Sequence, residues 1–334
     1  MIDIERPHHV AKQICLWAID PFDDSMMANQ TLVHQLINLA RTSNLEIQPV
    51  YVESTRPNWQ RTLQGSGDTS TSVRDLESLA ADYLERLSLT GVLPTRVIQA
   101  NLATRKDEVE KVVELSEELN ASFIVVSSHG RSGVQRLILG SFAENLLHLS
   151  RCPVLFLTHL KQDRARAEQI RRVIFSTDFS ESSRKAFLHF LLQAKSLSFE
   201  VRLFYSVTLP ASALVSSDGA LLGLPENYFL DQMKWAEEEG ARWIALAESK
   251  GVKARLVVID EGVCANIGET ILSTALQEQV DMIAMASVSG AVASFVMGSV
   301  AREVFRSNLY PVWLYGPKAL EKLKQPAIEL PKSA

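Results

Sequence analysis

Cysteines and long hydrophobic stretches are both scarce in this chain. Its 334 residues include three cysteines, Cys15, Cys152 and Cys264, which lie far apart. Their odd number and wide spacing fit neither a disulfide framework nor a metal site, so we expect reduced thiols in a cytoplasmic protein. The longest apolar runs, such as 14–19 and 123–126, have the length of strands and are too short to cross a bilayer. The first residues also lack a secretory signal pattern, and we expect no membrane partner.

No charge of one sign dominates the sequence, and two common nucleotide motifs are missing. Lys and Arg number 34 and Asp and Glu 39, which gives a formal net charge of −5. With no basic face and no helix-turn-helix pattern, we expect no nucleic-acid partner. The first predicted strand leads into Asp20-Pro21-Phe22 and not into a Gly-x-Gly-x-x-Gly run, and no Walker A lysine motif occurs. The dehydrogenase and P-loop classes are therefore disfavoured.

The sequence does contain an internal repeat at a fixed spacing of 158 residues. Three landmarks recur at this spacing: Gly140-Ser141 as Gly298-Ser299, Cys152-Pro153-Val154 as Tyr310-Pro311-Val312, and Asp20 as Asp178. Because a shared offset indicates one duplicated unit, the repeat predicts two copies of the same domain.

Each copy alternates short apolar strands with amphipathic helices. The first copy has predicted strands at 14–19, 46–52, 96–99, 123–126 and 154–158, and helices at 26–41, 73–87, 106–119 and 141–149. The second has predicted strands at 172–176, 200–205, 253–259, 282–286 and 312–315, and helices at 182–195, within 208–250, at 265–279 and at 299–306. Such alternation predicts an α/β fold of two tandem doubly wound domains, each an open five-stranded parallel sheet covered on both faces. We expect domain 1 over 10–160, domain 2 over 170–317 and a flexible tail over 318–334.

A loop rich in glycine and small polar residues follows the fourth predicted strand of the first copy. It contains Ser127, Ser128, His129, Gly130, Arg131, Gly133, Arg136, Gly140 and Ser141. Ligands of parallel sheets gather beyond the carboxyl ends of strands, where loop N–H groups and a helix N-terminus attract anions. The glycines permit close backbone approach, the serines add donors and the arginines add positive charge. The loop is therefore typical of a phosphate site.

The same residues also have an explanation without a ligand. Ser141 and Glu144 fit a capping box, and the glycines could serve only as turn and helix-entry residues. His129 fits a loop hydrogen bond better than a catalytic base, because no acidic neighbour in sequence orients it. Asp20 could be a strand-end turn residue and no more.

The loop resembles the ATP-binding pattern of the universal stress protein family, in its tandem two-domain form. That pattern is Gly, two residues, Gly, nine residues, Gly, then Ser or Thr, and Gly130, Gly140 and Ser141 match its last three elements. Ser127 stands where the first glycine belongs. The family's aspartate after the first strand, which approaches adenine and ribose, falls on Asp20, and its adenine-contacting valine falls on Val52.

The resemblance extends from residue 12 to 316 and includes both Pro-Val closing strands. It implies an adenine nucleotide alpha-hydrolase-like fold in each domain. It further implies that the closing strands 154–158 and 312–315 pair edge to edge as an intramolecular pseudo-dimer, because an exposed terminal strand is a template for pairing. Association of the chain into a homodimer is compatible with this arrangement.

The second copy departs further from the family pattern. If Ser289 replaces the second glycine, eight residues separate it from Gly298, one fewer than the family spacing. No Lys or Arg lies between Ala286 and Ser299, so the phosphates of ATP would depend on a helix end alone. The loop over 208–224 is apolar and could cover a lipophilic ligand, seal a domain interface or pack on its own core.

We therefore expect a cytoplasmic stress-response regulator that binds ATP in domain 1 only, with a magnesium ion as a potential companion. No attacking residue for hydrolysis is visible, so turnover would be slow at most. The alternative is a nucleotide-free scaffold for protein partners, consistent with Ser127 and with the altered second copy.

Overall fold

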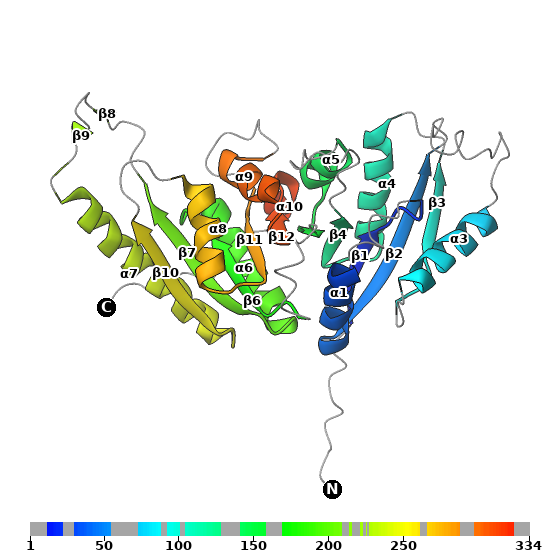
Figure 1. The fold of residues 1–334 in the computed structure, drawn as a ribbon, viewed down its shortest axis with the longest axis horizontal. Helices are drawn as coiled ribbons and strands as arrows, with labels where there is room; N and C mark the ends of the chain where they lie inside the picture. The colour runs from blue at the N-terminus through cyan, green and yellow to red at the C-terminus, as the bar shows by residue number, and fades with distance from the viewer. Residues whose placement is uncertain are drawn as a thin grey trace, which may run out of the picture.

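The structure is a computed structural model with a single large sheet at its centre (Figure 1). It describes residues 12–22, 30–54, 73–87, 92–100, 104–127, 141–157, 169–208, 214–215, 221–222, 225, 227–260, 266–287 and 297–323.

Domain 1 alternates strands and helices as the sequence predicts. Its elements are β1 (Gln13–Ala18), α1 (Gln30–Thr42), β2 (Leu45–Ser54), α3 (Val73–Arg86), β3 (Arg96–Ala100), α4 (Arg105–Glu118), β4 (Phe123–Ser127), α5 (Ser141–Leu149) and β5 (Val154–Leu157). Helix α4 begins where the sequence directs it to: Thr104 and Asp107 form a reciprocal capping box that satisfies two backbone N–H groups.

Domain 2 repeats this order and adds three short elements. It contains β6 (Arg172–Ser176), α6 (Glu181–Ser196), β7 (Glu200–Val207), β8 (Leu214–Val215), β9 (Leu221–Leu222), α7 (Tyr228–Ser249), β10 (Ala254–Asp260), α8 (Ile267–Gln277), β11 (Met282–Ala286), α9 (Ser299–Ser307), β12 (Val312–Tyr315) and α10 (Pro317–Lys322). The antiparallel pair β8–β9 lies within the apolar loop, whose remaining residues are outside the described ranges.

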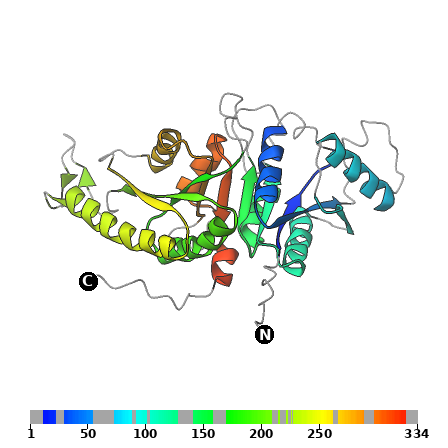
Figure 2. The same ribbon diagram turned by 90° about the horizontal axis from the view of Figure 1, so that it is seen from below.

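The two domains share one ten-stranded sheet with the order β10-β7-β6-β11-β12-β5-β4-β1-β2-β3. Each half is parallel, and the halves join through the antiparallel pair β12–β5, in which Trp313 lies opposite Leu155. The predicted edge-to-edge pseudo-dimer is thereby confirmed. Figure 2 shows the continuous sheet from below, with the two sets of helices on either side of the junction.

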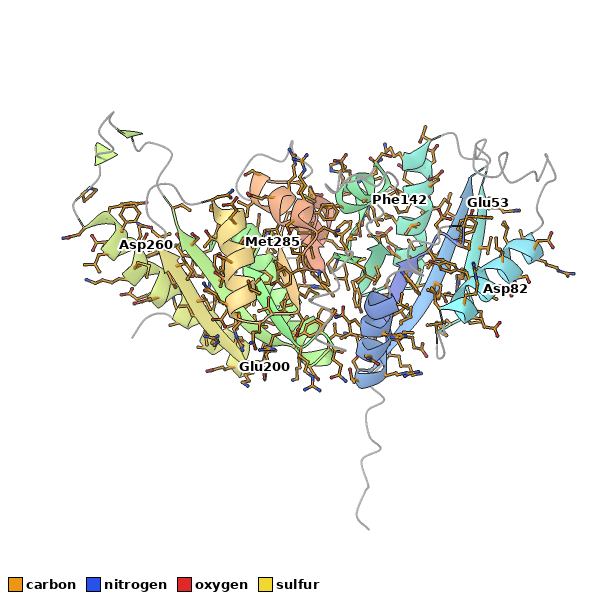
Figure 3. The ribbon with its side chains drawn as sticks, viewed as in Figure 1. Glu53, Asp82, Phe142, Glu200, Asp260 and Met285 are labelled. Atoms are coloured by element: carbon orange, nitrogen blue, oxygen red, sulfur yellow. The ribbon has the colours of Figure 1, made fainter. Side chains whose placement is uncertain are left out.

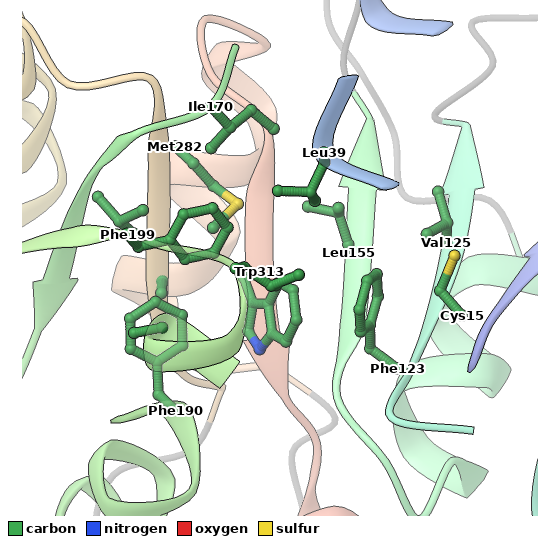
Figure 4. Packing of buried hydrophobic residues seen from close by; sticks show 14 of the residues in the cluster. Cys15, Leu39, Phe123, Val125, Leu155, Ile170, Phe190, Phe199, Met282 and Trp313 are labelled. Carbon is green, nitrogen blue, oxygen red and sulfur yellow. The ribbon is translucent and has the colours of Figure 1, made fainter. Parts of the chain in front are cut away.

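The hydrophobic core forms two layers, one on each face of the sheet, and both layers run through both domains. Helices α1, α3, α6 and α7 bury apolar side chains in one layer, and α4, α5, α8 and α9 bury theirs in the other. At the junction, Phe123 of β4 packs on Trp313 of β12 with ring centroids 4.6 Å apart. Figure 4 shows this contact beside Leu155, Phe190 and Met282. Because each core layer buries apolar side chains of both domains, the domains stabilise each other.

The carboxyl-terminal region differs from its prediction. The sequence predicts a flexible tail over 318–334, but Pro317–Lys322 forms α10, which buries Ala319 and Leu320. Proline at the first helical position suits a helix start, because its missing N–H would have no partner there. The sequence pattern does not reveal α10, because its six residues are too few to show a helical hydrophobic period.

Candidate functional site

The strand order reverses in each domain at a point between two central strands. In domain 1 the chain moves outward from β1 to β2 and β3 on one side, and to β4 and β5 on the other. A crevice opens where neighbouring loops leave the sheet in opposite directions, and ligands of doubly wound proteins bind there. Asp20 follows β1 and Ser127 ends β4, so the fold brings these two predicted site residues to the same switch point.

Asp20 lies in a tight turn just past the end of β1. Its Oδ1 accepts a hydrogen bond from the backbone N–H of Phe22 at 3.1 Å, and its side chain is partly exposed. The preceding residue, Ile19, donates its N–H to the Val50 carbonyl at 3.0 Å and thus continues the β1–β2 ladder. Asp20 is therefore a strand-end turn residue, and the turn fixes the position of its carboxylate just past β1.

Val52 belongs to a half-buried apolar platform at the end of β2, next to the strand that Asp20 follows. It lies opposite Ile98 in the β2–β3 register, and both are half-buried against the core layer that α4 and α5 also enter, as are Ala18 and Phe142. Figure 3 labels Phe142 near α5 and Glu53, the residue after Val52, at the end of β2, both at the upper edge of domain 1. Partly exposed apolar side chains at the carboxyl ends of strands offer a flat surface to a planar aromatic ligand.

Sequence reasoning found Val52 but missed Ala18, Ile98 and Phe142. The signal for Phe142 was available, because it directly follows Ser141 at the start of α5. The pairing of Val52 with Ile98 was not visible, because register depends on the packed sheet.

The predicted phosphate loop is only partly within the described residues. Ser127 ends β4, and Ser141 begins α5 with its side chain exposed. Five of the predicted site residues lie outside the described residues: His129, Gly130, Arg131, Gly133 and Gly140.

Domain 2 has the same switch point, between β6 and β11, and its aspartate holds the start of the next helix. Asp178 Oδ1 accepts hydrogen bonds from the Ser180 backbone N–H at 3.0 Å and from the Ser183 hydroxyl at 2.6 Å. The Ser180 hydroxyl in turn caps α6 by accepting from the Ser183 N–H. The carboxylate therefore serves the start of α6 directly.

The polar lining of domain 2 also differs at the position of Val52. Val50 pairs with Ala18 and Phe204 pairs with Ser176, so Ser206 occupies the place of Val52. Its hydroxyl is buried and has no hydrogen-bond partner among the residues that the structure describes. In domain 2, the Ser206 hydroxyl therefore stands where Val52 contributes an apolar side chain in domain 1.

The helix start of domain 2 is closed by its own backbone. The Gly298 N–H donates to the Ser287 carbonyl at 2.7 Å, which removes one N–H from any phosphate. Arg302, in the next turn of α9, reaches back and donates to the Met297 carbonyl at 3.2 Å. Arg302 therefore places a positive charge beside this loop, although no Lys or Arg lies between Ala286 and Ser299.

Aromatic side chains fill the space beside Asp178. Phe179 has a left-handed backbone with φ of 56°, which is costly for a bulky residue. Its ring stacks on Tyr205 at 5.0 Å and meets the edge of Trp235 at 5.6 Å. Burial, with smaller effects of Tyr228 and Asp178, raises the pKa of Tyr205, so its hydroxyl stays protonated.

The described residues contain no cluster of three or more His, Cys, Asp or Glu side chains that could hold a metal ion. Within the same ranges, no helix is long and apolar enough to cross a membrane.

The fold defines a tandem α/β protein with one strand-order switch point in each domain. The model of the universal stress protein family matches residues 16–157 and 169–315. The chain belongs to this family and has two of its domains, one in each matched segment.

Individual relatives agree with this assignment. Universal stress protein A homolog 1 of Coxiella burnetii is 50% identical over 129 residues, which cover 38% of this chain and 85% of that protein. A universal stress protein of Methanocaldococcus jannaschii is 26% identical over 148 residues, or 43% of this chain and 82% of that protein. The crystal structure of a universal stress protein from Archaeoglobus fulgidus covers 92% of this chain and 97% of its own, with a TM-score of 0.55 and 18% identity. At that identity the likeness concerns the fold.

Proposed function

We propose that this protein is a stress-response regulator that binds ATP in domain 1 only. The observation that carries the proposal is the half-buried apolar platform of Val52 and Ile98, on the two strands next to the one that Asp20 follows. Adenine would lie on the platform and the ribose beside Asp20. The phosphates would then extend toward Ser127, His129, Gly130, Arg131, Gly133, Gly140 and Ser141, accompanied by magnesium.

Two features of domain 2 argue against a second ATP there. Ser206 replaces the valine of the platform. The Gly298 N–H is already bonded to the Ser287 carbonyl. A phosphate would have to break that bond, whose loss would leave a carbonyl unpaired.

Matched substitutions in the two domains test this asymmetry. Isothermal titration of the full chain with ATP and magnesium should give one site per chain. Gly140→Asp should weaken binding at least about tenfold, because a carboxylate beside phosphates costs on the order of 1–4 kcal/mol. Gly298→Asp, at the repeated position, should leave the affinity unchanged. Equal effects of the two substitutions, or two sites per chain, would contradict the assignment to domain 1.

The competing function is a nucleotide-free scaffold for protein partners. It predicts no adenine absorbance in extracts of the denatured purified protein and no heat of ATP binding at millimolar concentration. If both results are obtained, the nucleotide proposal fails. Turnover of bound ATP, followed by phosphate release, should be slow or absent in either case.

A further inference from the structure

Strand β10 forms the outer edge of the sheet in domain 2. Within the part of the chain that the structure describes, it pairs with one strand, β7, over all seven of its residues. Figure 1 shows β10 at the outer margin of the sheet, next to α7. An edge strand of this length offers a backbone to which another strand can pair.

The register with β7 shows which backbone groups of β10 point to the open edge. The Lys253 carbonyl accepts from the Val201 N–H at 2.9 Å, so Lys253 directs its backbone groups to β7. Successive residues of a strand direct these groups to opposite sides. The groups of Val257 therefore point to β7, and those of Leu256 and Val258 point to the open edge.

Apolar side chains accompany this edge on the face that α8 covers. Val257 and Ile259 are half-buried against the core layer of α8 and α9. Arg255 of β10 forms an ion pair with Glu278, which ends α8, so that end of the helix lies next to β10. Leu276, two residues before Glu278, is 54% exposed. Incompletely buried apolar surface is therefore present both on β10 and at the neighbouring end of α8.

The corresponding edge of domain 1 carries charge instead. The β2–β3 register places Arg96 on β3 where the β7–β10 register places Val257 on β10. Arg96 forms an exposed ion pair with Glu118 at 2.9 Å. Charged side chains on an edge strand oppose its pairing with another chain. The apolar edge is therefore particular to domain 2.

The charges along β10 favour an antiparallel partner of the same sequence. Lys253 precedes the strand and Arg255 lies near its start, and their side chains remain 75% and 53% exposed although each has a carboxylate partner in its own chain. Asp260, which Figure 3 labels at the other end of the strand, is followed in the sequence by Glu261. Antiparallel pairing places the basic start of one copy beside the acidic end of the other, whereas parallel pairing places like charges together.

We propose that two copies of this chain associate through their β10 strands, which pair antiparallel about a twofold axis at Val257. The axis is normal to the sheet and keeps equivalent faces together. Leu256 of each copy then forms a hydrogen-bonded pair with Val258 of the other, and the two Val257 side chains lie directly opposite each other. The sheet continues from one copy into the next, as it does within one chain through the antiparallel pair β12–β5. The proposal does not depend on ATP binding.

Sedimentation equilibrium of the full chain tests the association. It should show a reversible monomer–dimer equilibrium at concentrations up to about 0.5 mM, where even a weak interface associates. Val257→Arg introduces the charge that domain 1 carries at Arg96. It should weaken the dimer at least about tenfold, because two guanidinium groups then face each other at the axis.

Leu192→Arg is the matched control, because it places the same charge at an exposed apolar position of α6. It should leave the dissociation constant unchanged. Circular dichroism and the melting temperature establish that both variants are folded. A monomer at the highest concentration would assign the edge to another occupant and overturn the proposal. A dimer that Val257→Arg does not weaken would overturn it as well.

Cysteine substitutions test the register of the pair. Val257→Cys places two thiols in a non-hydrogen-bonded pair, in which Cα atoms are about 4.5 Å apart and a disulfide fits. Mild oxidation should link two copies of this variant. Arg255→Cys, whose opposite residue is Ile259 of the second copy, should link far less, and the wild type measures the background from its native cysteines. Equal linking of the two variants would refute the axis at Val257. Titration with ATP is a separate measurement, so failure of the nucleotide proposal leaves this result unaffected.

Discussion

The neutral imidazole of His189 predicts that this protein loses stability on mild acidification. Its pKa is lowered from 6.5 to about 4 by burial and then by the charge of Lys322, while the unfolded chain should titrate near 6.5. Between these two values the unfolded state binds a proton that the folded state excludes. The contribution of His189 to the free energy of unfolding is therefore fully present above about pH 6.5 and is lost as the pH falls from about 6.5 to about 4.

The size of the effect follows from the two pKa values. One pKa unit corresponds to about 1.4 kcal/mol, so the His189 contribution lost between pH 7.5 and pH 5.0 is about 2 kcal/mol. Other groups also titrate over this range, and a substitution that removes only the imidazole isolates its share. His189→Gln should lower the stability at pH 7.5, because it alters the contact at 3.1 Å between His189 Nδ1 and the Tyr315 hydroxyl. The stability of this variant should depend less on pH than that of the wild type.

Urea denaturation at pH 7.5 and pH 5.0, followed by circular dichroism, measures the difference directly. The wild type should lose about 2 kcal/mol more than His189→Gln over this interval. His34→Gln removes an exposed imidazole from α1 and should retain the wild-type dependence. Equal losses in wild type and His189→Gln would refute the reasoning, because the buried ring would then not be excluded from protonation.

Three further substitutions test the junction and a helix start, each by urea or thermal denaturation. Trp313→Ala should cost about 3–5 kcal/mol, because the ring is fully buried between the domains, whereas Trp235→Ala, at a side chain 42% exposed, should cost clearly less. A reversed order would mean that the junction contributes little. Gly316→Ala should destabilise the chain by about 1–3 kcal/mol through overlap with the Leu147 carbonyl, and an unchanged melting temperature would contradict that contact. Ser180→Ala should cost about 1 kcal/mol by removing the cap of α6, and no loss would show that Asp178 alone holds the helix start.

The proposed asymmetry of ATP binding rests on small local differences on one shared fold. Val52 and Ser206 share a register position, yet one is apolar and the other buries a hydroxyl. A duplicated sheet therefore does not imply a duplicated ligand, because the ligand contacts the side chains and not the strands.

The sequence by itself determined the order of the five strands and four main helices of each domain. Strand-length apolar runs and helical spacing report which local face is buried, and this is why β6, β11, β12 and α5 begin and end where the pattern predicts. The repeat of Asp20 as Asp178 and of Gly140 as Gly298 likewise needed no coordinates, because it is a property of the letters.

Only the tertiary structure decided which distant segments meet. The opposition of Trp313 and Leu155, the pairing of Val52 with Ile98 and the return of Arg302 to the Met297 carbonyl depend on register and packing. A cleft of about 290 Å³ at the domain junction is lined by residues from 120 to 323 that no local pattern connects. The hydrophobic period of an element shows which of its faces is buried. A site forms only where packing places several elements against one another.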